Sequence, residues 1–128
     1  MQIYNKEAIQ AMWDIVKPLA KEIPIYKETF TEDASSTPKS YILLVSDITD
    51  NGKVYGDGTA KIRSHDCDIH LISKGVADSS KDLHNINKNK IAKLLQDNGI
   101  DYISVNLGYD DNQKRTEHTF SIEVLTNG

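Results

Sequence analysis

The chain has 128 residues, a net charge of −4 at pH 7 and a sequence isoelectric point of about 5.5. This length suits one hydrophobic core, so we expect a single domain over residues 1–128. The acidic balance offers no basic surface for nucleic-acid phosphates, and the lone cysteine, Cys67, excludes an internal disulfide and a multi-cysteine zinc site.

The N-terminal third predicts a helix, a short strand and a loop. Apolar residues recur every three or four positions from about Lys6 to about Glu22, which is typical of one helix face. Pro18 should kink or break this helix near Lys17. Charged residues interrupt the apolar ones, so we expect no signal peptide and no membrane span. Ile23 to Phe30 predicts a strand, and the polar segment Thr31 to Ser40 predicts a loop.

The segment from Tyr41 to Gly75 predicts a long β-hairpin. Tyr41 to Ile48 is apolar on both alternating faces, which suits a central strand that is covered on two sides. Its partner strand should run from Ala60 to Ser73. Between them, Asp50-Asn51-Gly52 and Gly56-Asp57-Gly58 are typical turn residues.

The second strand of this hairpin contains a register conflict. Ala60 and Ile62 lie at even positions, whereas the apolar residues from Cys67 to Leu71 lie at odd positions, so a regular strand cannot bury both sets on one face. A bulge between Ile62 and Cys67 would resolve the conflict. Alternatively, the polar piece from Lys61 to Asp66 projects beyond the sheet, where burial does not dictate register.

A second helix should follow the hairpin. Ser79-Ser80-Lys81-Asp82 resembles a capping box with Ser79 as the N-cap, and Gly99 after Asn98 is a typical left-handed helix stop. The expected apolar face of this helix consists of Leu83, Ile86, Lys90, Ile91, Leu94 and Leu95.

The C-terminal residues predict a hairpin. Asp101 to Leu107 alternates with Ile103, Val105 and Leu107 on one side, Gly108 to Gln113 forms a turn, and Arg115 to Leu125 alternates with Phe120, Ile122 and Val124 on one side. The predicted fold is therefore α+β, a mostly antiparallel sheet with two helices packed on it and a long β-hairpin.

The cluster from His65 to His70 has the composition of a metal site. Strand geometry places Asp66, Asp68 and His70 on one face, but spreads them over about 13 Å, which is too far for easy convergence on one ion. We therefore expect no metal and no cofactor, and Cys67 should be a small buried hydrophobe.

Other catalytic and binding motifs are incomplete. Asp47 to Gly52 resembles the start of a calcium loop, but the twelfth position is Gly58 and not glutamate. The glycines of this region lack the helix and lysine of a phosphate-binding loop. We expect His84 and His118 at the surface, and Met12 and Trp13 in the core. No catalytic residue is predicted.

The arrangement of these segments resembles the small tail-terminator or tail-completion proteins of long-tailed bacteriophages. The resemblance extends over about Tyr41 to Leu125 and is looser before it. Three of the features that carry it lie in the long hairpin: a strand ending in an acidic turn (Tyr41 to Asp50), a Tyr-x-Asp entry into a long strand (Tyr55-Gly56-Asp57), and an apolar strand ending in a lysine-bearing turn (Ile69 to Gly75). A helix of the Ile86 to Leu95 type follows. The last feature is a final hairpin with an acidic turn (Tyr109-Asp110-Asp111) and alternating Phe120, Ile122 and Val124.

The resemblance implies a structural virion protein and not an enzyme. Such a protein forms a ring, a hexamer, at the head-proximal end of the tail tube, stops tube growth and allows head-tail joining. Its partners would be copies of itself, the tail tube protein and a head-completion protein, with DNA only passing through the ring and no membrane contact. It would assemble in the host cytoplasm.

Two alternatives remain open from the sequence. One is a head-completion or connector protein of the phage neck, and the other is a small metal-dependent hydrolase that uses Asp66, Asp68 and His70. For the ring, an acidic lumen would let DNA slide without sticking. The candidate subunit or partner contacts are Tyr55, Asp57, Lys61, Arg63, Asp66, Asp68 and His70.

Overall fold

The computed structural model describes the backbone of residues 2–28, 37–46, 51–55, 59–75 and 81–127, and the side chains of 8–28, 37–46, 66–75 and 81–124. The elements in chain order are α1 (Gln2–Val16), the 3-10 helix η1 (Lys17–Lys21), β1 (Ile25–Lys27), β2 (Ser40–Ser46), β3 (Asn51–Tyr55), β4 (Thr59–Lys74), α2 (Leu83–Asp97), β5 (Ile103–Asp110) and β6 (Arg115–Asn127).

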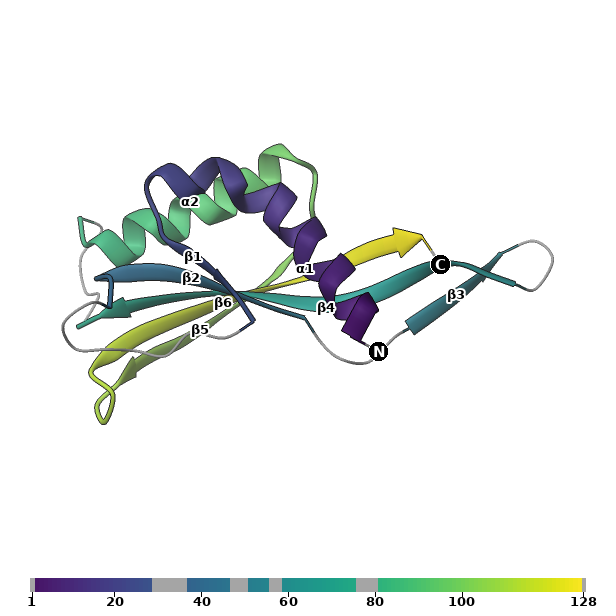
Figure 1. The fold of residues 1–128 in the computed structure, drawn as a ribbon. Coiled ribbons are helices and arrows are strands. Elements are labelled where there is room, and N and C mark those ends of the chain that lie inside the picture. Colours follow the sequence, from purple (N-terminus) through teal and green to yellow (C-terminus); the bar gives the residue numbers. More distant parts are fainter. Residues whose placement is uncertain (1, 29–36, 47–50, 56–58, 76–80, 128) are drawn as a thin grey trace.

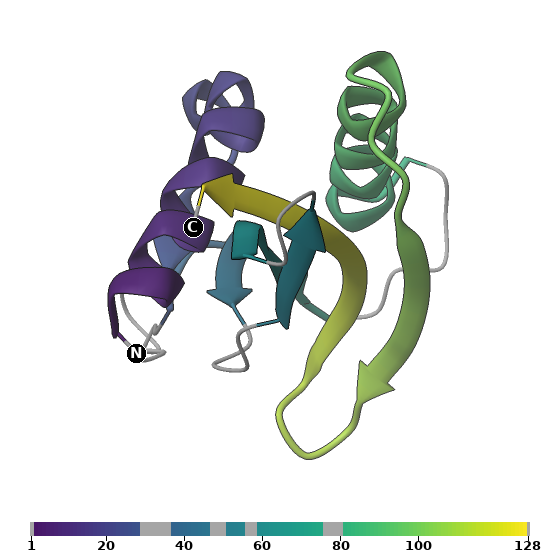
Figure 2. The ribbon, with the colours of Figure 1, turned by 90° about the vertical axis from the view of Figure 1, so that its right-hand side faces the viewer.

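The strands form one six-stranded sheet, and both helices cover the same face of it (Figures 1 and 2). The strand order is β1-β2-β4-β6-β5, and β3 pairs with β4 off this path. Among the strands that the structure describes, only the β1–β2 pairing is parallel. The predicted α+β class, with two helices on a mostly antiparallel sheet, is therefore confirmed.

The core lies between the helices and the sheet. Cys67, Ile69 and Leu71 on β4 and Phe120 on β6 are at most 1% exposed and pack beneath the helices. Burying a large apolar side chain in this way stabilises the fold by about 1.5–3 kcal/mol. Met12 is buried as predicted, and Trp13 is half-buried against the same core.

The N-terminal helix ends where its proline predicts. α1 stops at Val16, and the chain continues as η1 with Pro18 in its first turn. The missing amide hydrogen and the ring of the proline are incompatible with a continuous α-helix. The helix begins earlier than predicted, at Gln2, and the strand predicted over Ile23 to Phe30 is limited to β1 within its described part.

The predicted central strand and its long partner are both present. β2 lies between β1 and β4, and none of its residues is exposed. Its register with β4 runs from Ser40 opposite Ser73 to Ser46 opposite Cys67. Asp47 and Ile48, with the rest of the calcium-like segment up to Asp50, lie outside the described residues.

The loop of the predicted hairpin contains an additional strand. Asn51 and Gly52 were predicted to form a turn, but they begin β3 and pair with Ser64 and Arg63 of β4. That prediction was wrong because ladder hydrogen bonds to β4 outweigh the weak strand propensity of asparagine and glycine. β3 and the first part of β4 form a ribbon that extends well beyond the rest of the molecule (Figure 1).

The bulge predicted between Ile62 and Cys67 is absent from the β4–β6 ladder, whose register is continuous from Ile62 to Lys74. An irregularity occurs instead in the β3–β4 ladder, where Lys53 pairs with Ile62 and Val54 with Ala60. The second alternative is only partly right: Ile62 to Asp66 lie past the end of β2, which stops opposite Cys67, but they stay within the sheet, paired with Asn127 to Glu123 of β6.

The second helix begins later than predicted. Its N-cap is Asp82 and not Ser79, whose own position lies outside the described residues, and Lys81 is in a turn. Gly99 has a φ of +67° and ends the helix as predicted. Leu83 and Ile86, predicted for the apolar face, are 49% and 38% exposed.

The predicted C-terminal hairpin is present, and only one of its two strands contributes to the core. Phe120, Ile122 and Val124 of β6 are in the core. On β5, by contrast, Ile103, Val105 and Leu107 are all exposed. β5 is an edge strand, and it continues through Gly108 with a register irregularity, so the turn is shorter than predicted.

Candidate functional site

The candidate contact residues separate into two regions. Tyr55 lies on β3 and Lys61 and Arg63 lie on β4, all within the projecting ribbon, where their side chains lie outside the described part. Asp57 also lies outside the described residues. Asp66, Asp68 and His70 are on β4 in the body of the sheet, which places them away from the ribbon but on the same strand.

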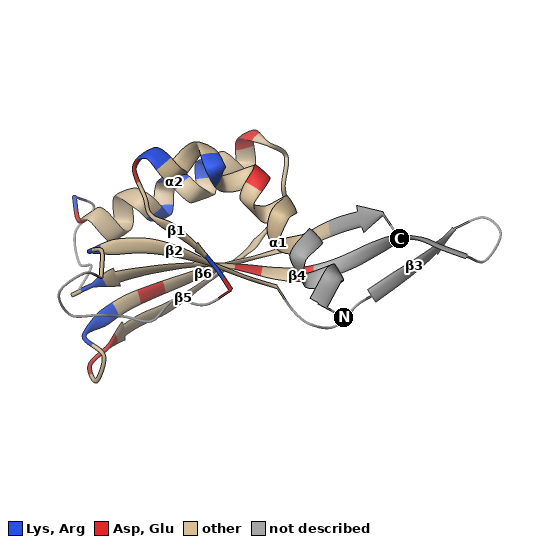
Figure 3. Ribbon diagram, viewed as in Figure 1, with Lys and Arg blue, Asp and Glu red and all other residues tan. Residues whose placement is uncertain are grey.

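Asp66, Asp68 and His70 share the face of the sheet that the helices leave open. They alternate with the core residues Cys67 and Ile69, so their side chains point to the opposite side. This confirms the predicted grouping on one face. Figure 3 shows the acidic residues of β4 and β6 along the sheet and several basic residues on the helices.

A row of polar contacts crosses this open face between β4 and β6. Ser121 Oγ donates a hydrogen bond to Asp68 Oδ1 at 2.7 Å, and His70 Nδ1 lies 2.9 Å from Thr119 Oγ1. Glu117 Oε2 lies 3.6 Å from the same His70 nitrogen, and Arg115 lies 3.7 Å from the other Glu117 oxygen. The row links alternate residues of β6 to β4 and fixes the orientation of the side chains on this face.

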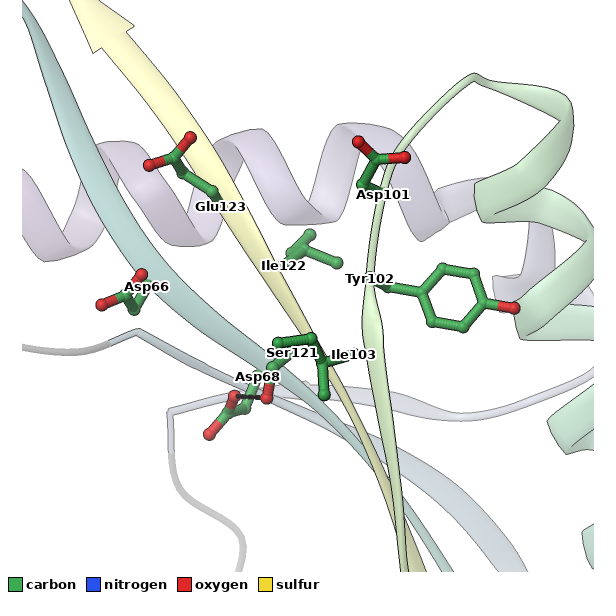
Figure 4. A pocket seen from close by; sticks show the side chains of 8 residues that line it. All are labelled: Asp66, Asp68, Asp101, Tyr102, Ile103, Ser121, Ile122 and Glu123. Atoms are coloured by element: carbon green, nitrogen blue, oxygen red, sulfur yellow. Dashed lines mark hydrogen bonds between the residues drawn. The ribbon is translucent and has the colours of Figure 1, made fainter.

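An open hollow of about 480 Å³ lies at one end of the row (Figure 4). Its walls come from β4, β6 and the start of β5, and four of its side chains are carboxylates: Asp66, Asp68, Asp101 and Glu123. No lysine or arginine is among its described lining residues, which also include Tyr102, Ile103, Ser121 and Ile122. The hollow is therefore acidic with apolar walls.

Two of these carboxylates repel each other by their position in the sheet. Asp66 is directly opposite Glu123 in the β4–β6 register, and both side chains are exposed. Like charges opposite each other on neighbouring strands are destabilising, although solvent reduces the cost at exposed positions. Asp101 and Glu123 could not be assigned to this site from the sequence, because only the strand pairing brings them beside Asp66.

The carboxylates do not form a metal site. Among the residues that the structure describes, no group of three or more His, Cys, Asp and Glu side chains is arranged to hold a metal ion. His70 Nε2 lies 3.9 Å from Asp68 Oδ2. The geometry of the described residues therefore gives no support to a metal-dependent hydrolase.

A buried polar cluster lies on the other face of the sheet, beneath α2. Asn87 Nδ2 donates to Ser40 Oγ at 2.9 Å, Ser40 Oγ lies 2.9 Å from Ser73 Oγ, and Ser73 Oγ lies 2.7 Å from His84 Nδ1. His84 is 5% exposed, so its predicted surface position is wrong. The same is true of His118, which is 6% exposed.

Both buried histidines are neutral near pH 7. The pKa of His84 is lowered to about 4, chiefly by burial and to a smaller extent by the nearby His118 and Lys88. Burial also lowers the pKa of His118, with Lys88 as a second cause. His118 Nε2 contacts Ser104 Oγ on β5, and His118 Nδ1 has no hydrogen-bond partner within the described part of the chain.

The serine and histidine of this cluster border a second hollow of about 380 Å³, whose lining also includes Lys39, Lys74 and Asp82. Ser73 Oγ already contacts both Ser40 and His84, so it is held between the two. Cys67 is 1% exposed in the core, where its thiol is not accessible to a substrate. The cluster thus anchors α2 to β2 and β4.

Comparison of the sequence with protein-family models and with curated proteins finds no match in either. Within the described part of the chain, neither helix has the length and apolar character needed to cross a bilayer.

Proposed function

We propose that this chain is a structural phage protein of the tail-terminator kind, which forms a ring at the head-proximal end of the tail tube. The observation that carries the proposal is the projecting β3–β4 ribbon. The base of the ribbon is three-stranded, because Ile62 to Ser64 also pair with β6, but its tip, where Val54 and Tyr55 pair with Ala60 and Thr59, has two strands only. A two-stranded ribbon is marginally stable by itself in water. Contact with a neighbouring molecule would stabilise it, and a ring provides such a neighbour for every subunit.

The geometry of a ring supports this role for the ribbon. Ring closure requires heterologous contacts, in which one surface of a subunit binds a different surface of the next. A ribbon that extends past the core reaches a surface on the adjacent subunit without using the same patch on both molecules. Tyr55, Lys61 and Arg63 are its candidate contacts in this proposal.

The acidic open face of the sheet supports the proposal that DNA passes through the ring. Asp66, Asp68, Asp101 and Glu123 gather on one side of the sheet, in a hollow without lysine or arginine among its described lining residues. A surface of this charge repels nucleic-acid phosphates and does not retain DNA. We propose that this face lines the opening through which the DNA passes.

The partners in this proposal are copies of the chain itself, the tail tube protein on one side of the ring and a head-completion protein on the other. The protein would reside in the virion, at the head-proximal end of the tail, after assembly in the host cytoplasm. No catalytic step is proposed.

Deletion of the gene from the phage that carries it tests this function. We expect tubes of uncontrolled length and no joined particles in electron micrographs, with rescue by the chain supplied from a plasmid. Tails of normal length accumulating beside unjoined heads would instead support a head-completion or connector role. Complete particles with normal tails in the deletion strain would overturn both.

A further inference from the structure

The first half of α2, residues 83–90, is held to the sheet mainly by polar side chains. Its buried side chains are His84 and Asn87, and its large apolar side chains are exposed. In the second half, residues 91–97, the buried side chains are apolar and belong to the core. A typical hydrogen bond contributes less to stability than a large buried apolar side chain. The first half of the helix is therefore the more weakly held.

The hydrogen bonds of this half form a series with a direction. Its members in order are Asn87, Ser40, Ser73 and His84, and the three contacts are 2.9, 2.9 and 2.7 Å long. The amide nitrogen of Asn87 only donates, so it supplies a hydrogen to Ser40 Oγ. If Ser40 then donates to Ser73, and Ser73 donates to His84 Nδ1, every hydrogen in the series has an acceptor. His84 is then neutral and accepts at Nδ1.

A proton on His84 Nδ1 reverses this direction. The nitrogen must then donate to Ser73 Oγ, and Ser73 must donate to Ser40 Oγ. The hydroxyl hydrogen of Ser40 is left without an acceptor in the series, because the Asn87 amide group beside it is itself a donor. Ser40 is 5% exposed, and a buried donor without a partner is costly. Protonation of the histidine therefore opposes the docking of this half of α2.

The charged groups around His84 act in the same direction. After burial, which is the main cause, His118 of β6 and Lys88 of α2 also lower the pKa of His84. The hollow at this end of the helix is lined by two further cations and one carboxylate: Lys39, Lys74 and Asp82. A proton on His118 is also unfavourable, because its Nδ1 is buried without a hydrogen-bond partner in the described part of the protein. Among the described groups that face His84, cations therefore outnumber carboxylates.

We propose that the series from Asn87 to His84 is a proton-sensitive fastening of α2, and that acid releases residues 83–90 from the sheet while residues 91–97 stay docked. The sheet need not open, since the apolar side chains of the second half remain in the core. Proteins commonly open in such local units at a lower free energy than global unfolding requires. The device is independent of the proposed ring, because its members lie beneath α2, away from the ribbon and the open face.

Amide hydrogen exchange of the wild-type protein tests the release. Residues 86–90 report on the first half, since the Ile86 amide is bonded to Asp82 within the helix, and residues 94–97 report on the second half. With the pKa of His84 lowered from 6.5 to about 4, its protonation should make opening of the first half about 20-fold more frequent at pH 5 than at pH 7. Protection factors correct for the intrinsic pH dependence of exchange.

Low concentrations of urea distinguish local release from global unfolding. Release of two helical turns exposes little surface, so the opening seen by residues 86–90 at pH 5 should not respond to urea. Exchange of residues 94–97 should accelerate with urea, as global unfolding does. A common opening constant and a common urea dependence for both halves would overturn the proposal. The absence of any increase between pH 7 and pH 5 would also overturn it.

His84→Asn separates the proton from the contact. The amide oxygen of asparagine can accept from Ser73 Oγ, as neutral Nδ1 does, but it takes no proton in this pH range. The increase in opening between pH 7 and pH 5 should therefore shrink to the part that His118 contributes. An increase as large as in the wild-type protein would show that His84 is not the group that senses the proton.

Asn87→Asp tests the direction of the series. A carboxylate only accepts, so Ser40 donates to it, Ser73 donates to Ser40, and His84 Nδ1 donates to Ser73. A protonated histidine then satisfies every member, so the pKa of His84, followed by NMR of its imidazole, should rise, and acid should no longer release the first half. Asn89→Asp is the matched control, because it adds the same charge at an exposed position of the same helix.

Equal pKa values of His84 in these two variants would refute the assigned direction. If Asn87→Asp does not fold, the exchange of the wild-type protein and of His84→Asn still decides whether acid releases the first half of α2. Neither measurement depends on tail assembly, so failure of this inference and failure of the proposed function are separate results.

Discussion

His84 Nδ1 on α2 lies 2.7 Å from Ser73 Oγ on β4, and this contact fastens the first turn of the helix to the sheet. The serine is directly opposite Ser40 in the β2–β4 register, and Ser40 receives a hydrogen bond from Asn87 one turn further along α2. Two helical residues and two strand residues thus form one continuous buried chain of hydrogen bonds. In this half of α2 the helix is held by polar contacts, while Ile91 and Leu95 hold the other half in the core.

Removal of the central hydroxyl should destabilise the protein. Ser73→Ala leaves His84 Nδ1 and Ser40 Oγ each without one partner in a buried site, which costs about 1–3 kcal/mol in the free energy of unfolding. Urea denaturation followed by circular dichroism measures the loss. Asn89→Ala, at an exposed position of the same helix, is the control and should change stability by less than about 0.5 kcal/mol. Equal effects of the two substitutions would show that the network contributes nothing.

The same histidine makes stability depend on pH. The pKa of His84 is lowered from 6.5 to about 4 in the folded state, chiefly by burial, so the unfolded chain binds a proton more readily than the folded one between these values. The free energy of unfolding should therefore be independent of this group above about pH 7, fall as the pH decreases from 6.5 to 4, and level off below. The loss is about 3 kcal/mol, because each unit of pKa difference corresponds to about 1.4 kcal/mol.

A variant isolates this contribution from the acidic residues, which also titrate at low pH. In His84→Asn the amide can occupy the position of Nδ1 but carries no titratable group. The slope of stability against pH between 6.5 and 5 should decrease in this variant. Some slope should remain, since burial also lowers the pKa of His118. An unchanged slope would contradict the proposed origin of the pH dependence.

The end of α2 gives a separate prediction about backbone conformation. Gly99 has a φ of +67°, and a β-carbon added there would meet no atom within 4 Å. Gly99→Ala should therefore cost about 1 kcal/mol through backbone strain alone, without a clash. Gly99→Asn should cost less, because asparagine tolerates the left-handed region better. Chemical denaturation of the two variants compares them, and a larger loss for asparagine would refute this explanation.

The sequence correctly predicts those elements in which the residues of the apolar pattern are also the residues buried in the core. β4 and β6 alternate as buried strands do, and Pro18 correctly places the end of α1. The network of Ser40, Ser73 and His84 was not predicted, because each residue by itself resembles a surface polar residue. Only the strand register and the packing of α2 bring them together.

β5 shows what an alternating pattern leaves undecided. Ile103, Val105 and Leu107 alternate as in a buried strand, yet the strand lies at the edge of the sheet and all three are exposed. Hydrophobic periodicity identifies the strand and its two faces but cannot say whether anything covers them. Asp66 and Asp68 of the acidic hollow were predicted as contact residues from the sequence. Its other two carboxylates, Asp101 and Glu123, are brought there by strand pairing that the sequence does not reveal.

Charge reversal on the open face gives a direct test of the proposed DNA passage. The wild-type chain should not bind double-stranded DNA at about 150 mM salt, because the carboxylates of the hollow repel phosphates. Asp66→Lys with Glu123→Lys replaces two of them with cations and raises the net charge from −4 to 0, since each exchange adds two positive charges. Fluorescence anisotropy with labelled duplex DNA should then detect binding that weakens as salt increases.

The control for this experiment has the same net charge but a different location. Asp14→Lys with Glu22→Lys changes exposed residues of α1 and the end of η1, on the helical side of the sheet. If the open face lines a passage, cations placed there converge from every subunit of the ring, so the open-face variant should bind DNA more tightly than the control. Equal affinity of the two variants would show that net charge alone governs the interaction, and the open face would lose its proposed role as the lining of the passage.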